Sequence, residues 1–422
     1  MDDRKIAIRG TLCAILGGVC WGFSGTMGQF LFSQKGLTLF KCTQTQGGTT
    51  MKPVDLERFW ADDELAHRDN CFSKDAPQVA LGIRMSDECV FAELNEPGNP
   101  WGTTPRERRI ELNKRYNDLA EKIVGRRLLR ENFPLEEEIP PEYRGIGEVF
   151  GGQYVFDNNV TWLKGSCSTP KELEAMLDRV DKMDLEDFIL PDNWYAEKKR
   201  VYERCGALPR LWRHVRGPVT LASSIFGAEN LIYLYYDEPE LFTRFSQTIL
   251  RVILTYIRVS TREAGLTMET APHGFSFADD DCNLFTPDMY EAFGYPVLKE
   301  VFSVCSPNPE DSRYQHSDSA MGHLLPILGR LNLTGCNFGP TVKVEDIRHY
   351  MPNTRIDGQL APFTFMRNNE DEIIAEVKRD CDAIRSTGTR GLNLSTAGSI
   401  NNGSLLTSMR AVMYAIQQYG RY

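Results

Sequence analysis

The sequence predicts an α/β protein built on a (β/α)8 barrel of the TIM type, preceded by an N-terminal extension. From about residue 208 onward, short strand-like segments alternate with amphipathic segments of helical length, a pattern typical of a parallel sheet. No glycine-rich dinucleotide fingerprint accompanies these units, which favours a closed barrel over an open doubly wound sheet. The chain has 422 residues, of which 41% are hydrophobic and 25% charged. This is ordinary globular composition, and α/β barrels often exceed the usual domain size as a single unit.

The strands of this barrel are predicted from six segments that end in small, charged or imidazole-bearing residues. They are residues 211–215, 274–281, 313–318, 333–338, 354–360 and 391–396. Helices are predicted between them at 239–265, from Pro287 onward behind the N-cap Thr286, and at 370–386, where Gly388 closes the helix. Strands and helices therefore follow one another in the order that a barrel requires.

We expect three segments along the chain: a hydrophobic segment 1–45, a helical and hairpin region 46–165 packed on the barrel, and the barrel itself at 166–422. In the second segment, Pro105 begins a long charged helix that runs to residue 133. Asn158 and Asn159 mark the turn of a hairpin over residues 153–163. The helix is dense in arginine, and two interpretations stay open: a solvated face balanced by glutamates, or a rim that attracts acidic substrates.

The N-terminal segment carries no charged residue between Arg9 and Lys35, and residues 11–32 are long enough to cross a bilayer. Three interpretations are open: a single transmembrane helix that tethers the protein to a membrane, an appended gene-start fragment, and a buried core helix. The pattern Gly-Gly-x-Cys-Trp-Gly-x-Ser-Gly over residues 17–25 resembles the first membrane span of EamA-type transporters. No second span follows it, which argues against transport by this chain alone.

Charge and cysteine content narrow the class of protein. The formal net charge of −10 and the sequence pI near 5.3 argue against nucleic-acid binding, because a protein that neutralises phosphates needs a basic face. The eleven cysteines include no Cys-x-x-Cys pair, which favours a reducing, cytoplasmic compartment over a disulfide framework. We expect a small-molecule substrate, and the sequence leaves homodimer formation open.

The strand ends hold the candidate site, because barrel enzymes build their active sites at the carboxyl ends of the strands. The sharpest strand end is the acidic triplet 279–281. Consecutive side chains of a strand point to opposite faces, so Asp279 and Asp281 are expected on one face and Asp280 on the other. The alternative is an acidic turn that caps the next helix. Other polar groups at strand ends are His214, Arg216, His316, Asp318, Asn337, Asp357, Gln359 and Ser399.

Four motifs in residues 160–422 resemble the uroporphyrinogen decarboxylase superfamily, and the resemblance extends over roughly residues 50–422. They are Arg-Gly-Pro-Val-Thr-Leu-Ala at 216–222, the strand 275–282 leading into Thr-Pro-Asp-Met-Tyr-Glu-Ala-Phe-Gly-Tyr-Pro at 286–296, Gln-His-Ser-Asp at 315–318, and Ala-Gly-Ser-Ile at 397–400. The Arg-Gln-Ala-Gly-Arg string that holds substrate carboxylates in porphyrinogen decarboxylases is missing from this chain. Arg84 is a candidate stand-in for it.

The resemblance implies decarboxylation of a tetrapyrrole or another carboxylated substrate, with no cofactor required. His316 would be the proton donor, and Asp279, Asp281 and Asp318 would complete the catalytic set. The arginines would clamp substrate carboxylates. The expected substrate-binding residues are Arg84, Arg213, His214, Arg216, Asn337, Asp357, Gln359 and Ser399.

Two other functions remain open. The superfamily also contains corrinoid-dependent methyltransferases, which would require a separate corrinoid protein as partner. The zinc-bearing branch of these enzymes uses His-x-Cys and a second cysteine, but the matching positions here are His316-Ser317-Asp318 and Ser399, which argues against a zinc thiolate site. A harder metal site of His316, Asp318 and one aspartate of the triplet is the alternative to a metal-free site. The third function is a non-catalytic barrel that binds a tetrapyrrole.

Overall fold

The computed structural model describes residues 51–157 and 160–422, and residues Lys52–Tyr422 form one compact unit. The predicted span 11–32 and the hairpin turn at Asn158 and Asn159 lie outside the described residues. Within the described ranges, no helix combines the length and the apolar character needed to cross a membrane.

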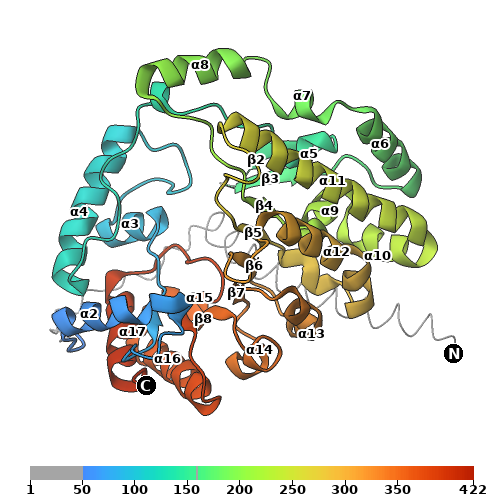
Figure 1. Cartoon of the computed structure of the whole chain (residues 1–422). Coiled ribbons are helices and arrows are strands. Elements are labelled where there is room, and N and C mark those ends of the chain that lie inside the picture. The colour runs from blue at the N-terminus through green and yellow to red at the C-terminus, as the bar shows by residue number, and fades with distance from the viewer. Residues whose placement is uncertain (1–50, 158–159) are drawn as a thin grey trace, which may run out of the picture. The chain divides into compact units, whose positions relative to one another are not determined.

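The core of this unit is a seven-stranded sheet in which every neighbouring pair of strands is parallel. The strands lie in the order β1-β9-β8-β7-β6-β5-β4, so β4 to β9 follow one another in sequence order and β1 lies at the edge beside β9. Figure 1 shows the succession from β4 to β8. The strands are β1 (Ala80–Leu81), β4 (His214–Arg216), β5 (Phe275–Ala278), β6 (Arg313–Ser317), β7 (Gly335–Phe338), β8 (Arg355–Leu360) and β9 (Leu392–Thr396). This order is consistent with a TIM-type barrel.

Six of the seven strands are those predicted from the sequence, but an eighth parallel strand is missing from the described chain. No pairing joins β1 to β4 in the described ranges, because the long connection between them folds into helices and a separate hairpin. Its elements are α3 (Asp87–Leu94), α4 (Arg106–Val124), α5 (Ile146–Val149), β2 (Gln153–Asp157), β3 (Val160–Lys164), α6 (Pro170–Lys182), α7 (Leu185–Ile189) and α8 (Trp194–Cys205). The sheet also takes β1 from the region 46–165, outside the segment 166–422 that was predicted to hold the barrel.

Helices cover the outer side of the sheet, and Figure 1 shows them following one another along strands β4 to β8. Strand β5 shows why the sheet needs this cover: Phe275 and Phe277 are buried, while the alternating Ser276 and Ala278 are half-buried. Besides α2 (Leu56–Ala66), the helices are α9 (Pro218–Phe226), α10 (Ala228–Asp237), α11 (Pro239–Glu263), α12 (Pro287–Cys305), α13 (Leu325–Leu328), α14 (Val344–Tyr350), α15 (Pro362–Met366), α16 (Glu370–Ser386) and α17 (Leu406–Tyr419). The predicted α11, α12 and α16 are confirmed.

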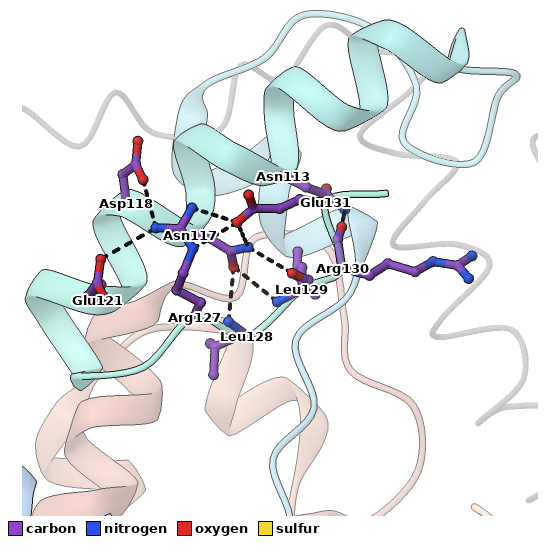
Figure 2. A network of polar contacts seen from close by, with 9 residues as sticks. All are labelled: Asn113, Asn117, Asp118, Glu121, Arg127, Leu128, Leu129, Arg130 and Glu131. Atoms are coloured by element: carbon purple, nitrogen blue, oxygen red, sulfur yellow. Dashed lines mark hydrogen bonds and ion pairs between the residues drawn. The ribbon is translucent and has the colours of Figure 1, made fainter. Parts of the chain in front are cut away.

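Helix α4 is shorter than predicted, because Gly125 adopts a left-handed conformation and ends it (φ 78°). The chain then returns along the helix, where Asn117, fully buried, donates hydrogen bonds to the carbonyl of Leu129 and to the Glu131 carboxylate, both at 2.7 Å. Its Oδ1 accepts the backbone N–H of Leu128 at 2.9 Å, as Figure 2 shows. One buried amide therefore fixes the returning segment.

The arginines of this region are mostly paired with acids. Arg127 contacts the carboxylates of Asp118, Glu121 and Glu131, and Figure 2 shows these three contacts together. The side chain of Arg130 points away from that network and stacks on Phe133, with 4.4 Å from its Cζ to the ring centroid. These contacts agree with the acid-balanced interpretation of the arginine-rich helix.

Candidate active site

The carboxyl ends of β4 to β7 bring predicted site residues into one row. The parallel register aligns Arg216 with Ala278, Ala278 with His316, and His316 with Asn337. Adjacent strands lie about 5 Å apart, so these four positions form a continuous ledge across the sheet. Because these strand ends are aligned, the residues that follow them, including the acidic triplet, lie at the same end of the sheet.

The acidic triplet does not continue the strand. Strand β5 ends at Ala278, and a 3₁₀ helix begins at Asp280 and runs to Leu284. The alternation expected for a strand therefore stops before the triplet. Asp279 is completely buried, whereas Asp280 lies beside His316, with 3.6 Å between its Oδ1 and the His316 Nε2. The geometry thus places Asp280, rather than Asp279, next to the predicted proton donor.

Asp280, His316 and Asp318 form a group whose ligand atoms all lie within 4.8 Å of one another. The backbone N–H of Asp318 donates to Asp280 Oδ1 at 3.2 Å, and the Ser319 hydroxyl donates to the Asp280 carbonyl at 2.7 Å. Asp318 is open to solvent on one side, but desolvation by the surrounding protein and the nearby Asp280 carboxylate raise its pKa. One imidazole and two carboxylates suit a divalent metal such as Mn²⁺, Fe²⁺ or Zn²⁺.

Asp281 adds a third carboxylate to this end of the barrel. Burial and the negative charge of Asp280 raise the pKa of Asp281 to about 6, against the opposing effects of Ser223 and Arg216. Its backbone N–H donates to the Thr220 hydroxyl at 2.9 Å. The negative charge of Asp280 therefore disfavours ionisation of both Asp281 and Asp318.

Asp279 binds the start of α9 instead of facing the site. Its Oδ1 accepts the backbone N–H of Thr220 at 2.8 Å, while its Oδ2 has no hydrogen-bond partner in the described chain. Burial raises the pKa of Asp279 to about 7, although the hydrogen bonding from Thr220 opposes this shift. A Cβ on Gly217 would lie 2.2 Å from the Asp279 Cβ, so glycine is needed where the two segments meet. Asp279 therefore caps α9, which is distant in sequence, whereas the helix after the triplet, α12, is capped by Thr286.

The basic residues predicted for the site divide into two sets. His214 and Arg216 are exposed and lie on the same face of β4, and His214 Nδ1 is 2.8 Å from the Ser276 hydroxyl. Partial desolvation of the ring by the surrounding protein and the positive charge of nearby His316 lower the pKa of His214. Arg84 is exposed just beyond the carboxyl end of β1. Arg213 alternates with His214 and donates to the Thr261 hydroxyl of α11 at 3.0 Å, so it lies on the helix side of the strand.

The side chains of Asn337 and Gln359 form hydrogen bonds with backbone groups. Asn337 donates to the carbonyl of Thr396 at 3.0 Å and accepts the N–H of Gly398 at 3.1 Å, which ties β7 to the loop after β9. Gln359 is buried and donates to the carbonyl of Val342 at 2.6 Å. These two residues hold loops at the mouth of the barrel.

Asp357 and Ser399 differ in how close they come to the acidic group. Asp357 forms an ion pair with Arg355, with 2.7 Å between Oδ1 and Nε, and its carboxylate is 13% exposed. Ser399 is exposed and follows Gly398, where a Cβ would lie 2.8 Å from the Cβ of Asp318. The loop that carries Ser399 therefore borders the site, whereas Asp357 is neutralised inside the barrel.

Sequence reasoning ranked Asp280 last in the triplet and missed Thr220. A signal for Asp280 was present, because the helix start at Thr286 and Pro287 leaves too few residues for a strand to run through the triplet and then turn. Thr220 lies in a motif already singled out, 216–222, but nothing in the sequence shows which backbone groups its hydroxyl reaches.

The fold agrees with what comparisons with known proteins found. The search of curated proteins found no match. A solved structure, a methyltransferase from Methanosarcina mazei, superposes with a TM-score of 0.52 at 16% sequence identity, covering 82% of this chain and 95% of that one. That similarity shows the shared fold. The resemblance of residues 17–25 to EamA-type transporters gains no support. The family model for uroporphyrinogen decarboxylase matches residues 205–419, about half of the chain, so the chain belongs to the uroporphyrinogen decarboxylase (URO-D) family.

Proposed function

We propose that this protein is a metal-dependent methyltransferase that exchanges a methyl group between a small molecule and a corrinoid held by a separate protein. The observation that carries the proposal is the convergence of Asp280, His316 and Asp318 at the carboxyl ends of β5 and β6. These residues fit a divalent cation by donor type, and three protein ligands leave coordination positions open for a substrate.

The charge of the site supports this choice over tetrapyrrole decarboxylation. Asp318 and Asp281 both have raised pKa values, and the Asp280 carboxylate contributes to each shift. A divalent cation would relieve this repulsion, whereas a substrate with many carboxylates would add to it. The acidic group therefore favours a bound cation.

The residues around the acidic group would have distinct roles. A metal ion held by His316 and the two carboxylates would act as a Lewis acid that polarises the heteroatom bearing the methyl group. Arg216, across the ledge, would bind an anionic part of the substrate. His214, whose Nδ1 is engaged by Ser276, keeps its Nε2 available to hold or accept a proton.

The proposal includes a separate corrinoid protein as partner, and two observations support it. The described unit Lys52–Tyr422 is one compact body built on the barrel. The structural neighbour from Methanosarcina mazei is a methyltransferase of similar fold. The mouth of the barrel would then face both the substrate and the partner's corrinoid.

Decarboxylation is the second candidate, favoured by the family model. In that case His316 would protonate the substrate, Asp281 would stabilise the cation that develops, and Arg84 and Arg216 would bind carboxylates. This reaction needs no metal, so metal dependence separates the two candidates.

The test compares both reactions on the full-length protein before and after treatment with a chelator. Methyl transfer is followed by the absorbance change when cob(I)alamin becomes methylated by a panel of methylated ethers, amines and thioethers, with Zn²⁺ or Mn²⁺ restored. Asp280→Asn and Asp318→Asn should each weaken metal binding by about 100-fold, because each removes one anionic ligand. Asp346→Asn, an exposed aspartate on α14, is the matched control.

Metal-dependent methyl transfer that disappears in Asp318→Asn supports the proposal. Carbon dioxide release from a uroporphyrinogen by chelator-treated protein would overturn it in favour of decarboxylation. Unchanged metal binding in both aspartate variants would remove its central observation.

A further inference from the structure

We propose that Thr220 and Asp279 are positioning residues that fix the acidic turn of the site, and that metal affinity depends on them although neither is a metal ligand. This inference rests on the proposed metal site at Asp280, His316 and Asp318. It concerns how a site on a short turn, rather than on a rigid strand, keeps its geometry.

Thr220 holds the residues on both sides of Asp280. Its backbone N–H donates to Asp279 Oδ1 at 2.8 Å, and its hydroxyl oxygen accepts the backbone N–H of Asp281 at 2.9 Å. Thr220 is 6% exposed and is the third residue of α9, where backbone N–H groups have no partner within the helix. One residue of α9 therefore binds the turn at two points.

Asp279 connects this clamp to the strand that carries the other two ligands. Its backbone N–H donates to the carbonyl of His316 at 2.9 Å, and its fully buried side chain caps α9. Gly217 donates its backbone N–H to the carbonyl of Ala278 at 2.7 Å and makes room for the Asp279 side chain. Helix α9, the acidic turn and β6 are thus joined through one buried residue, whose carboxyl binds α9 and whose backbone N–H binds β6.

Asp280 itself is tied from the other side. The Ser319 hydroxyl donates to its carbonyl, and the Asp318 N–H donates to its Oδ1. Contacts from α9 before and after Asp280, and from the β6 loop onto Asp280, leave the turn no direction in which to move without losing a hydrogen bond. Residues that hydrogen-bond to metal ligands without binding the metal orient those ligands, and they typically contribute about 10- to 100-fold to metal affinity.

The test removes one hydroxyl and restores it. Thr220→Val deletes the acceptor for the Asp281 N–H while keeping the side-chain shape and the backbone N–H that binds Asp279. Thr220→Ser keeps the hydroxyl. The matched control is Thr248→Val in α11, where a hydroxyl that is also buried donates to the carbonyl of Arg244 at 2.9 Å. The probe is Mn²⁺ alone, titrated by isothermal calorimetry into full-length, chelator-treated protein.

We expect Thr220→Val to weaken Mn²⁺ binding by about 10-fold or more and Thr220→Ser to bind as the wild type does. Thr248→Val should leave Mn²⁺ binding unchanged, although its thermal stability should be similar to that of Thr220→Val. Equal affinity of all three variants and the wild type would overturn the inference while leaving the metal site in place. A wild type that binds no Mn²⁺, Zn²⁺ or Fe²⁺ would instead overturn the proposed function on which it rests.

A measurement on the wild type covers the case in which Thr220→Val does not fold. If the Thr220 contact positions the turn, metal binding must in return strengthen that contact, because coupling between two equilibria is reciprocal. The backbone N–H of Asp281 should then exchange with solvent deuterium more slowly when Mn²⁺ is bound. Unchanged exchange at Asp281, with protection elsewhere in the site, would refute the coupling.

Discussion

The buried carboxyl of Asp279 should contribute to the pH dependence of the protein's stability, and Asp279→Asn should remove that contribution. The pKa of Asp279 is raised to about 7 by complete burial, against an ordinary value of 3.8. Between these values the folded protein holds a proton that the unfolded chain releases. The free energy of unfolding therefore falls as the pH rises from about 4 to about 7.

The size of the effect follows from this shift. Three pKa units correspond to about 4 kcal/mol for the whole transition, and the part between about pH 5 and pH 8 is about 2–3 kcal/mol. The Asn side chain keeps the oxygen that accepts the Thr220 N–H but has no group that titrates in this pH range. The variant should therefore lose less stability than the wild type as the pH rises.

The assay is urea unfolding of both proteins at several pH values, with a chelator present so that metal binding does not contribute. Asp311→Asn is a control of opposite sign. Burial raises the pKa of Asp311, but hydrogen bonds from Asn308 and His273 overcome this effect and lower it. Its contribution to stability is lost only as the pH falls through the acidic range, so it should be constant between about pH 5 and 8. Parallel pH profiles for wild type and Asp279→Asn would refute the reasoning.

Three further changes test other contacts. Gly217→Ala should lower the free energy of unfolding by about 2 kcal/mol or more, because its Cβ would lie 2.2 Å from the Cβ of Asp279. Gly322→Ala, with no atom within 4 Å of its Cβ, is the control and should be nearly neutral in thermal unfolding. Asp357→Asn should cost about 3 kcal/mol in urea unfolding, since it leaves the Arg355 charge inside the barrel without its partner; a change below about 0.5 kcal/mol would contradict this. Asn117→Ala should cost about 2–4 kcal/mol and expose the segment after α4 to proteolysis, because several buried hydrogen bonds are lost.

The sequence was sufficient for the parts of the fold that repeat a pattern. Strands β4 to β9 were predicted because each is a short strand-like segment between helical ones, and α11 because its apolar face is regular. Strand β1 was not predicted, because two paired residues are too few to show a periodicity. The (β/α)8 prediction implied an eighth strand, and its absence from the described residues was not foreseen, because the region between β1 and β4 folds into helices and a hairpin instead.

The candidate site was predicted in its location and less well in its members. His316 and Asp318 were identified because they follow a strand in a barrel. Asp280 was ranked below its neighbours because the alternation rule was applied beyond the end of β5 at Ala278. Whether a polar side chain is free or already bound, as for Gln359, depends on contacts between distant segments that no sequence pattern reports.

Strand β1 has a consequence for how the molecule can be made. It pairs with β9, so a strand near the start of the described chain forms its hydrogen bonds with one near the end. During synthesis on the ribosome, β1 and the helices packed on it must remain without their final partner until almost the whole chain has emerged. A contact between segments this distant in sequence forms slowly, and the edges of the unpaired strands are exposed until it forms. The same pairing means that cutting the chain at the family-matched region 205–419 would remove the strand that covers β9, leaving an open edge prone to aggregation.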